Sequence, residues 1–546
     1  MNTVVIRRLL LSKGSIMSVH STRLADRCLR FVTAFSLLLL ASPVRPQAAK
    51  PPATRSAEAR SNVSSALAAM GGETQLRALK TISWSAIGHR FMREQSERPL
   101  GPWLVDYFQI VQLRDLQHRR LREERRSRGC DSTSCEKSAD WQSSTFVFAN
   151  DVGAHVADGK FQPAQPDAAR QAYELLAFAP EQILLEALAA PDLHAEEPIL
   201  FHGFAQNVIS FLRSGVPVRI ILNPVTHLPA AVEFTRPIPN SVFWGPWGDV
   251  STRILWSFWQ LEPGGLHYPR QWDIESNGRP DYTLTINELT LNPEAPADQF
   301  FIPEDIASAI RARRRPIDDI PFGRPNSPPI NLAPGIVQVP GSWNVEEVRL
   351  DDGIVIIEGP ISNGYSARTI EDAQHRFPGL PIKAVITTSD AWPHIGGLRE
   401  YAARGIPMYA LDLNAEILSE LFAAPYRIFP DALAKKHRKP DLRLVSQRTP
   451  LGSGINRMEL IPLRTQTGER QLFIYFPDHR LLYSSDLFQR DQTGAFFLPQ
   501  TLSEAVDAAR RENLNVDTVF GMHLAPTPWK TVIDFVSSIV NAAPTH

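Results

Sequence analysis

The stretch Ile386–Gly397, ITTSDAWPHIGG, links two runs of opposite character. The residues that lead into it, IKAV, are apolar and partly β-branched, which is typical of a buried strand. The residues that follow it, LREYAARG, favour a helix. The same alternation of strand-like and helical runs continues from about residue 336 to the C-terminus, and it predicts a layered α/β domain.

The preceding part of the chain predicts mostly antiparallel β structure. Short β-branched or aromatic segments such as YFQIVQLRD and VRIILNP follow one another, with turn residues between many of them. One helical run, ARQAYELLAFAPEQILLEALAA, interrupts them and should be broken at Pro180. We therefore predict a curved antiparallel sheet with helices against it.

The length of 546 residues is too great for one hydrophobic core, so we predict two domains, with three as the alternative. The strand and helix patterns of the two parts together predict an α+β fold class. A segment with many prolines, RARRRPIDDIPFGRPNSPPINLAPG, marks the boundary between them. The predicted divisions are a signal peptide over 1–48, a linker over 49–60, a β-rich domain over 61–308, a proline-rich linker over 309–335, and the layered domain over 336–546.

The charge balance argues against nucleic acid as a partner. Lysine and arginine number 57, against 58 aspartates and glutamates. A local basic run, from Arg114 to Arg128, is interrupted by three acidic residues and predicts a solvated strand-and-turn face.

The N-terminal residues indicate export. Three arginines precede the apolar run Phe31–Ala41, and small residues follow it, as in a secretory signal. The run is too short for a convincing membrane span, so we expect a periplasmic protein with no stable transmembrane segment after cleavage. Met17 is an alternative start to Met1, and an uncleaved anchor is the alternative to a signal peptide.

The predicted export determines the oxidation state expected for Cys130 and Cys135 in RGCDSTSCEK. In an oxidising compartment two cysteines this close are expected to form a small disulfide loop. A metal site would need further ligands nearby, and the surrounding sequence offers none.

Four segments of residues 336–546 resemble the metallo-β-lactamase superfamily. They are DDGIVIIEGPISNGYS, PGLPIKAVITTSDAWPHIGGLREYAARG, FIYFPDHRLLYSSDLF and FGMHLAPTPW, in the order that the family has them. The resemblance implies an αβ/βα sandwich with a metal site at one edge.

The family's signature loop reads H-x-H-x-D-H, and here only its last position, His394, is kept. The resemblance implies that Asp486 and His523 stand at two further ligand positions. The other ligand positions are degenerate: Ser389, Ala391, Pro393 and Arg464. One of the family's two metal sites is therefore lost, whereas three of the four ligands of the other remain.

Two hypotheses follow from this pattern. In the favoured one, the domain is a pseudoenzyme or small-molecule-binding protein without a metal, in which Arg464 supplies a fixed cation paired with Asp486. In the alternative, His394, Asp486 and His523 hold one weakly bound zinc or iron ion, with help from Asp390. Asp486 and His523 would then serve a metal-dependent hydrolase.

The N-terminal domain resembles periplasmic lipoprotein carriers of the LolA type in two short pieces, MGGETQLRALKTISWSAIG and ADQFFIPED. Large aromatic residues also gather in one region, including Trp244, Trp247, Trp256 and Trp272. They predict either core packing on a sheet face or the lining of an apolar cavity. A small-molecule or lipid-like ligand is therefore an expected partner.

Overall fold

The structure is a computed structural model that describes residues 52–542, except 94–97, 99, 130–140, 314 and 492. The predicted signal peptide and the predicted Cys130–Cys135 disulfide lie outside the described residues. Within the described residues, no helix has the length and apolar character needed to cross a bilayer.

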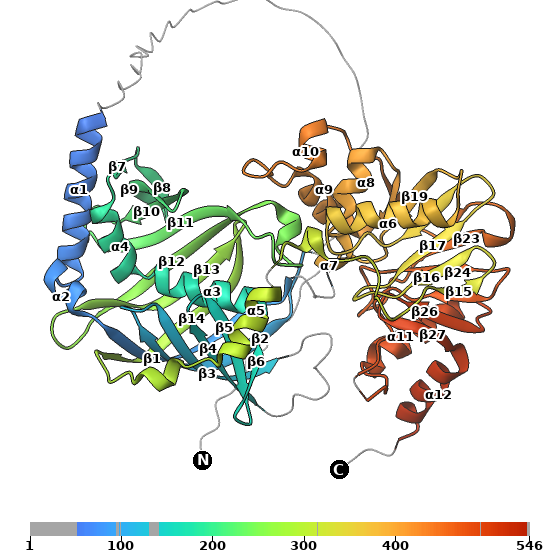
Figure 1. The fold of residues 1–546 in the computed structure, drawn as a ribbon, viewed down its shortest axis with the longest axis horizontal. Helices are drawn as coiled ribbons and strands as arrows, with labels where there is room; N and C mark the ends of the chain where they lie inside the picture. The colour runs from blue at the N-terminus through green and yellow to red at the C-terminus, as the bar shows by residue number, and fades with distance from the viewer. Residues whose placement is uncertain are drawn as a thin grey trace, which may run out of the picture. The chain divides into compact units, whose positions relative to one another are not determined.

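The first domain is an antiparallel sheet of fourteen described strands with helices packed on it (Figure 1). Its strands are β1 (Thr81–Phe91), β2 (Val105–Asp115), β3 (Arg120–Gly129), β4 (Gln142–Ala149), β5 (Val152–Ala157), β6 (Lys160–Pro163), β7 (His194–Ala195), β8 (Ile199–Phe201), β9 (Phe204–Arg213), β10 (Val216–Leu222), β11 (Pro229–Pro237), β12 (Asp249–Leu261), β13 (His267–Ser276) and β14 (Arg279–Leu291). Its helices are α1 (Pro52–Ala69), α2 (Glu73–Ala78), α3 (Pro166–Ala177), α4 (Pro180–Ala189) and α5 (Glu304–Arg313).

Most strands of this sheet pair with a sequence neighbour, in the order β6-β5-β4-β3-β2-β1-β14-β13-β12-β11-β10-β9-β7. Helices α1, α3 and α4 cover one face, where Val63, Leu176 and Ile183 join Trp84 and Trp272 in one buried core. The predicted helix break is confirmed, because α3 ends at Ala177 and α4 begins at Pro180. The likeness to LolA-type carriers stays a prediction.

Two segments expected as linkers carry regular structure. Helix α1 begins at Pro52, inside the predicted linker 49–60, because its Ala59 and Val63 bury an apolar face in the core. In the predicted linker 309–335, strand β15 (Ile330–Ala333) forms the edge of a sheet, where proline is tolerated nearby. Ile317 of the same segment is also buried.

The basic run of the sequence forms the β2–β3 hairpin as predicted, but Arg114 is not solvated. It is fully buried, and its guanidinium lies 3.5 Å from the ring centroid of Trp84. Glu123 is buried as well. Alternation along the strands places these residues on the covered face of the sheet, which the charge count of the run could not reveal.

The second domain contains two sheets. One has the order β15-β16-β17-β18-β19-β20-β21 and the other β22-β23-β24-β25-β26-β27. Their remaining strands are β16 (Ile336–Val339), β17 (Val345–Arg349), β18 (Ile354–Ile357), β19 (Ile382–Ile386), β20 (Met408–Leu411), β21 (Leu442–Val445), β22 (Thr449–Leu451), β23 (Met458–Pro462), β24 (Leu472–Phe476), β25 (Leu481–Tyr483), β26 (Thr518–Gly521) and β27 (Leu524–Pro528). The helices are α6 (Asn363–Arg376), α7 (Trp392–Ile395), α8 (Leu398–Arg404), α9 (Ala415–Ala423), α10 (Ala432–Lys436), α11 (Pro499–Arg511) and α12 (Trp529–Val540).

The two sheets pack face to face with helices outside them (Figure 1). Val355 and Ile386 of one sheet meet Ile474 and Phe520 of the other in a shared core. Helices α6, α8 and α9 cover the outer face of the first sheet, and α11 and α12 cover that of the second. This is the αβ/βα sandwich that the sequence resemblance implied.

The loops that follow four strands of this sandwich carry the residues of the candidate site. Strands β18 and β19 run parallel in the first sheet, and β25 and β26 run parallel in the second. Because parallel strands end at the same edge of a sheet, the loops after them meet there, which is where open α/β sheets place their ligand sites.

Candidate metal centre

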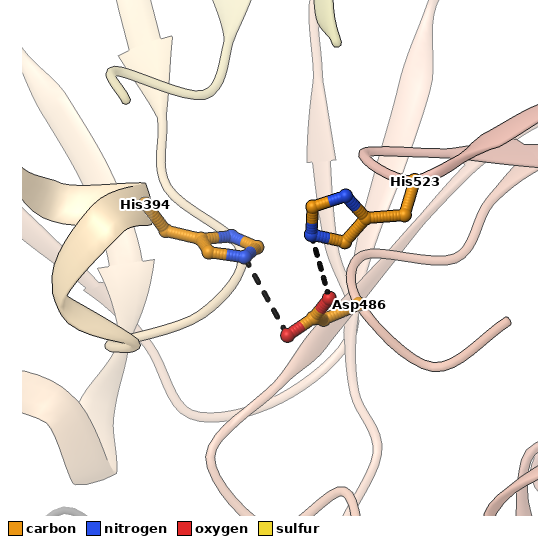
Figure 2. Close-up of side chains that lie close together, drawn as sticks. All are labelled: His394, Asp486 and His523. Atoms are coloured by element: carbon orange, nitrogen blue, oxygen red, sulfur yellow. Dashed lines mark ion pairs between the residues drawn. The ribbon is translucent and has the colours of Figure 1, made fainter. Parts of the chain in front are cut away.

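His394, Asp486 and His523 lie together at this edge (Figure 2). The Nε2 atom of His394 is 3.6 Å from Oδ2 of Asp486, and Nε2 of His523 is 3.2 Å from Oδ1 of Asp486. The two imidazole rings are 6.2 Å apart between centroids. The carboxylate of Asp486 thus faces both imidazoles, one with each oxygen.

The triad has the dimensions of a metal site. Two ligand atoms, each about 2 Å from a tetrahedral zinc ion, lie about 3.3 Å from one another. One ligand atom from each of the three side chains can be chosen such that all lie within 4.8 Å of one another. This is the one cluster of its kind among the residues that the structure describes.

The histidine nitrogens support the same assignment. Both ring nitrogens of His394 are buried and have no hydrogen-bond partner in the protein. A buried polar atom without a partner costs free energy, and a metal ion would satisfy Nε2. Two imidazoles and one carboxylate suit zinc, so the residues present fit the metal that the sequence resemblance implies.

Glu358 is a site residue that sequence reasoning missed. It follows β18 directly, is fully buried, and its Oε2 atom lies 3.5 Å from Nδ1 of His394. Its other oxygen accepts hydrogen bonds from Thr388 and from the hydroxyl of Tyr483. A carboxylate behind a histidine ligand orients the ring and leaves the other nitrogen free for a metal.

The backbone at Glu358 adds to this picture. Its φ is 77°, in the left-handed region that non-glycine residues rarely adopt. Such a conformation costs free energy and is found preferentially at functional sites. The sequence did hold one signal, a charged residue at the end of the apolar run IVII at a sheet edge.

His394 and Asp486 hold one another in their ionised forms. Burial disfavours the cationic form of His394, but Asp486 and Glu358 outweigh it and raise the pKa of His394 to about 9. Burial also opposes ionisation of Asp486, yet His394 and His523 keep the pKa of Asp486 well below its usual range. The metal-free triad is therefore a cation clamped between carboxylates.

Three degenerate positions of the signature loop are buried and contribute no ligand. The hydroxyl of Ser389 accepts a hydrogen bond from the backbone N–H of Ala391, 3.1 Å away. Ala391 precedes α7, and Pro393 stands in its first turn, where proline is favoured. At Gly397, between α7 and α8, the chain approaches α6 so closely that an added Cβ would lie 2.0 Å from Oγ of Ser366.

The predicted ion pair between Arg464 and Asp486 is wrong. Arg464 is exposed and donates to Oδ1 of Asp412 at 2.6 Å. The cation beside the signature loop is instead Arg470, whose Nη1 lies 3.0 Å from Oδ1 of Asp390. Both residues of this pair are buried, so Asp390 is engaged with Arg470 and not with the triad. Both arginines lie in the loop between β23 and β24, so sequence spacing could not tell them apart.

Trp392 of the signature loop faces the first domain. Its ring makes edge contacts with Trp244 and with Trp247, each at 4.8 Å between centroids. The guanidinium of Arg93 lies over the rings of Trp244 and Trp392. Core packing is confirmed for Trp272 and for Trp256, whereas Trp244 and Trp247 belong to this contact between domains.

Comparison with known proteins gives a likeness of limited extent. No family profile and no curated protein matches this sequence. Among solved structures, a metallo-β-lactamase from Pontibacter korlensis has 14% identity and a TM-score of 0.30, over 39% of this chain and 99% of that one. The inverting sec-alkylsulfatase Pisa1 from a Pseudomonas species has 15% identity and a TM-score of 0.29, over 38% of this chain and 40% of that one. The DIM-1 metallo-β-lactamase has 14% identity and a TM-score of 0.30, over 41% of this chain and 100% of that one. We draw no conclusion about activity from likenesses of this size.

Proposed function

We propose that this chain is an exported protein of the metallo-β-lactamase type that binds a single divalent metal ion and has lost the two-metal hydrolytic centre. The observation that carries the proposal is the preformed cluster of His394, Asp486 and His523. Zinc bound there would supply Lewis acidity to a ligand that reaches the open side of the site.

The main objection to metal binding was an arginine paired with Asp486, and the structure places no arginine there among the described residues. A fixed guanidinium paired with Asp486 would repel a divalent ion. Arg464 is turned to Asp412, and the charge of Arg470 is balanced by Asp390. The triad itself keeps one carboxylate and the nearby carboxylate of Glu358, which together favour a cation.

A binding role fits the site better than hydrolysis, because no carboxylate around the triad, among the residues that the structure describes, is free to act as a general base. Asp486 faces two histidines, and Asp390 faces Arg470. Glu358 is fully buried and accepts hydrogen bonds from two side chains. Pro393 stands where the family has its catalytic-loop carboxylate, and proline offers neither a ligand nor a base. We therefore favour a pseudoenzyme that holds a small molecule at a single metal.

A single-metal hydrolase is the second candidate, and one observation favours it. Asp486 and His523 have 18% and 26% of their side chains exposed, whereas His394 has only 1%. Water can thus approach the triad from the side of His523. In this candidate Asp486 and His523 would be the residues nearest to the reacting water.

The test of metal binding is elemental analysis followed by calorimetric titration with zinc. The unmodified protein should bind one ion, and His523→Ala should abolish binding. His375→Ala, at an exposed position of α6, is the matched control and should leave binding unchanged. Two tightly bound ions, or equal binding by His523→Ala, would overturn the proposal.

The choice between the two candidates needs an activity measurement. Zinc-loaded and metal-free protein are compared on chromogenic carboxylate, phosphate and sulfate esters and on a β-lactam. No metal-dependent turnover supports the pseudoenzyme. Turnover that requires zinc and disappears in Asp486→Asn would select the hydrolase instead.

Export remains part of the proposal. It is tested by cell fractionation and by determining the N-terminal residue of the mature protein. A mature chain that begins close to residue 49, in the periplasmic fraction, supports it, whereas cytoplasmic protein with an intact N-terminus would contradict it.

A further inference from the structure

A large cavity that excludes the triad is lined mostly by the first domain, with Ile317, Ile320 and Ser342 contributing from the chain that follows it. Its volume is about 870 Å³, which is in the size range of small-molecule sites. Its walls come from α3, from the segment that follows β11, and from α5 with the residues after it. Apolar side chains form much of the wall, among them Phe148, Tyr173, Ile238, Val242 and Ile310.

Four arginines face this apolar cavity: Arg170, Arg236, Arg313 and Arg315. The acidic residues of its lining are two, Asp151 and Asp167. The carboxylate of Asp167 is already shared between Arg170, 3.2 Å away, and the hydroxyl of Ser241, 2.6 Å away. The lining therefore has more cationic than anionic groups.

One of the two inner arginines, Arg236, lacks a partner for part of its guanidinium. Arg170 and Arg236 both pair with Glu174, which lies behind the cavity wall. The Nη1 atom of Arg236 is buried and has no hydrogen-bond partner. Burial, and then the neighbouring cation Arg170, lower the pKa of Arg236 to about 9. An anionic ligand would supply the missing acceptor and offset the repulsion between the two guanidiniums.

The two outer arginines differ from the inner two in being exposed to solvent. Arg313 and Arg315 are exposed and stand at the rim of the cavity. Charges at a rim steer an anion toward its site, while buried guanidiniums fix its position. The cavity thus combines an apolar interior with cations at its rim and on one inner wall.

We propose that this cavity binds a small amphiphile with one anionic head group and an apolar chain. Carboxylate and phosphate head groups share the chemistry that guanidinium forks recognise, so both are included. The inference extends the binding role proposed for the chain by adding a second site, and it does not require the metal site to be occupied.

The test is calorimetric titration of the full mature chain, in chelator and without metal, with four ten-carbon probes below their micelle concentrations. The probes are decanoate, decyl phosphate, decanol and decyltrimethylammonium. Decanoate or decyl phosphate should bind at least about tenfold more tightly than decanol and decyltrimethylammonium, since a charge-assisted hydrogen bond contributes that much. Binding of all four probes with equal affinity, or of none, would overturn the proposal.

Variants locate the binding. Arg313→Gln with Arg315→Gln removes two exposed charges without disturbing the core, and should weaken binding of the anions several-fold. Val242→Trp, at a half-buried wall position, should abolish binding by filling the cavity. Arg443→Gln with Arg510→Gln is the control of equal charge, at exposed positions of the second domain, and should change nothing. Anion binding that survives Val242→Trp in folded protein would place the ligand elsewhere and refute the assignment.

Because the titration contains chelator, its outcome is independent of the metal proposal. Anion binding without any zinc affinity would leave the cavity assigned and remove the metal centre. Zinc binding without amphiphile binding would do the reverse.

Discussion

Zinc binding to the triad should release about one proton per ion at pH 7.5, because His394 is a cation in the metal-free protein. Its pKa is raised to about 9: burial opposes the charge, but the carboxylates of Asp486 and Glu358 overcome this effect. A metal can bind only to the neutral imidazole, so the proton must leave first.

The size of the effect follows from the pKa. At pH 7 the gap of about two pKa units corresponds to about 2.7 kcal/mol, or roughly a hundredfold loss of apparent zinc affinity. Apparent affinity should therefore rise about tenfold per pH unit between pH 6 and 8. The stabilising ion pairs of His394 have the opposite dependence, since they weaken as the pH rises through 9 and His394 becomes neutral.

The assay is calorimetry in two buffers of different ionisation enthalpy, which counts the protons released. Glu358→Gln removes one of the carboxylates that hold the proton and keeps an acceptor oxygen for Thr388 and Tyr483. This variant should release fewer protons and show a shallower pH dependence. Glu347→Gln, a buried carboxylate paired with Arg376, is the control and should behave as the unmodified protein. An apparent affinity that is flat from pH 6 to 8, with no proton released, would refute the reasoning.

Three further predictions concern stability and oxidation state. Burial raises the pKa of Glu181 to about 7. The free energy of unfolding should therefore fall by an amount on the order of 3 kcal/mol as the pH rises from about 4.5 to 7. Denaturant titrations of Glu181→Gln should show a smaller fall. Arg470→Met leaves Asp390 buried without its partner and should lower the free energy of unfolding by about 3 kcal/mol. Arg464→Met, at an exposed position, should lower it by under about 1 kcal/mol. Equal losses would contradict the corrected assignment of the cation. Mass spectrometry of unreduced peptides should show Cys130 joined to Cys135, and two free thiols in exported protein would contradict the export proposal.

The sequence was sufficient for features that depend on local pattern. Alternating strand-like and helical runs predicted the layered second domain, and β-branched segments predicted the antiparallel first domain. Pro180 marked the helix break because proline cannot continue a helix in its interior. The triad was proposed from the resemblance of its loops to the metallo-β-lactamase signature. The three side chains lie together because residues after parallel strands converge at one edge of a sheet.

Other features depended on which chain segments meet in space. Glu358 is a charged residue after a strand in the sequence, and only the fold brings its carboxylate to 3.5 Å from Nδ1 of His394. Spacing selected Arg464 as the cation near the lost site, yet the course of the loop turns it to Asp412 and buries Arg470 against Asp390.

The contact of Trp392 with Trp244, across about 150 residues of chain, has no local signal at all. Strand and helix preferences are set by neighbours in sequence, so the sequence by itself predicted the elements, their order and three candidate ligands. Partners of buried charges and aromatic rings are set by packing between distant segments, so only the tertiary structure decided which carboxylate orients His394 and which arginine stands beside its loop.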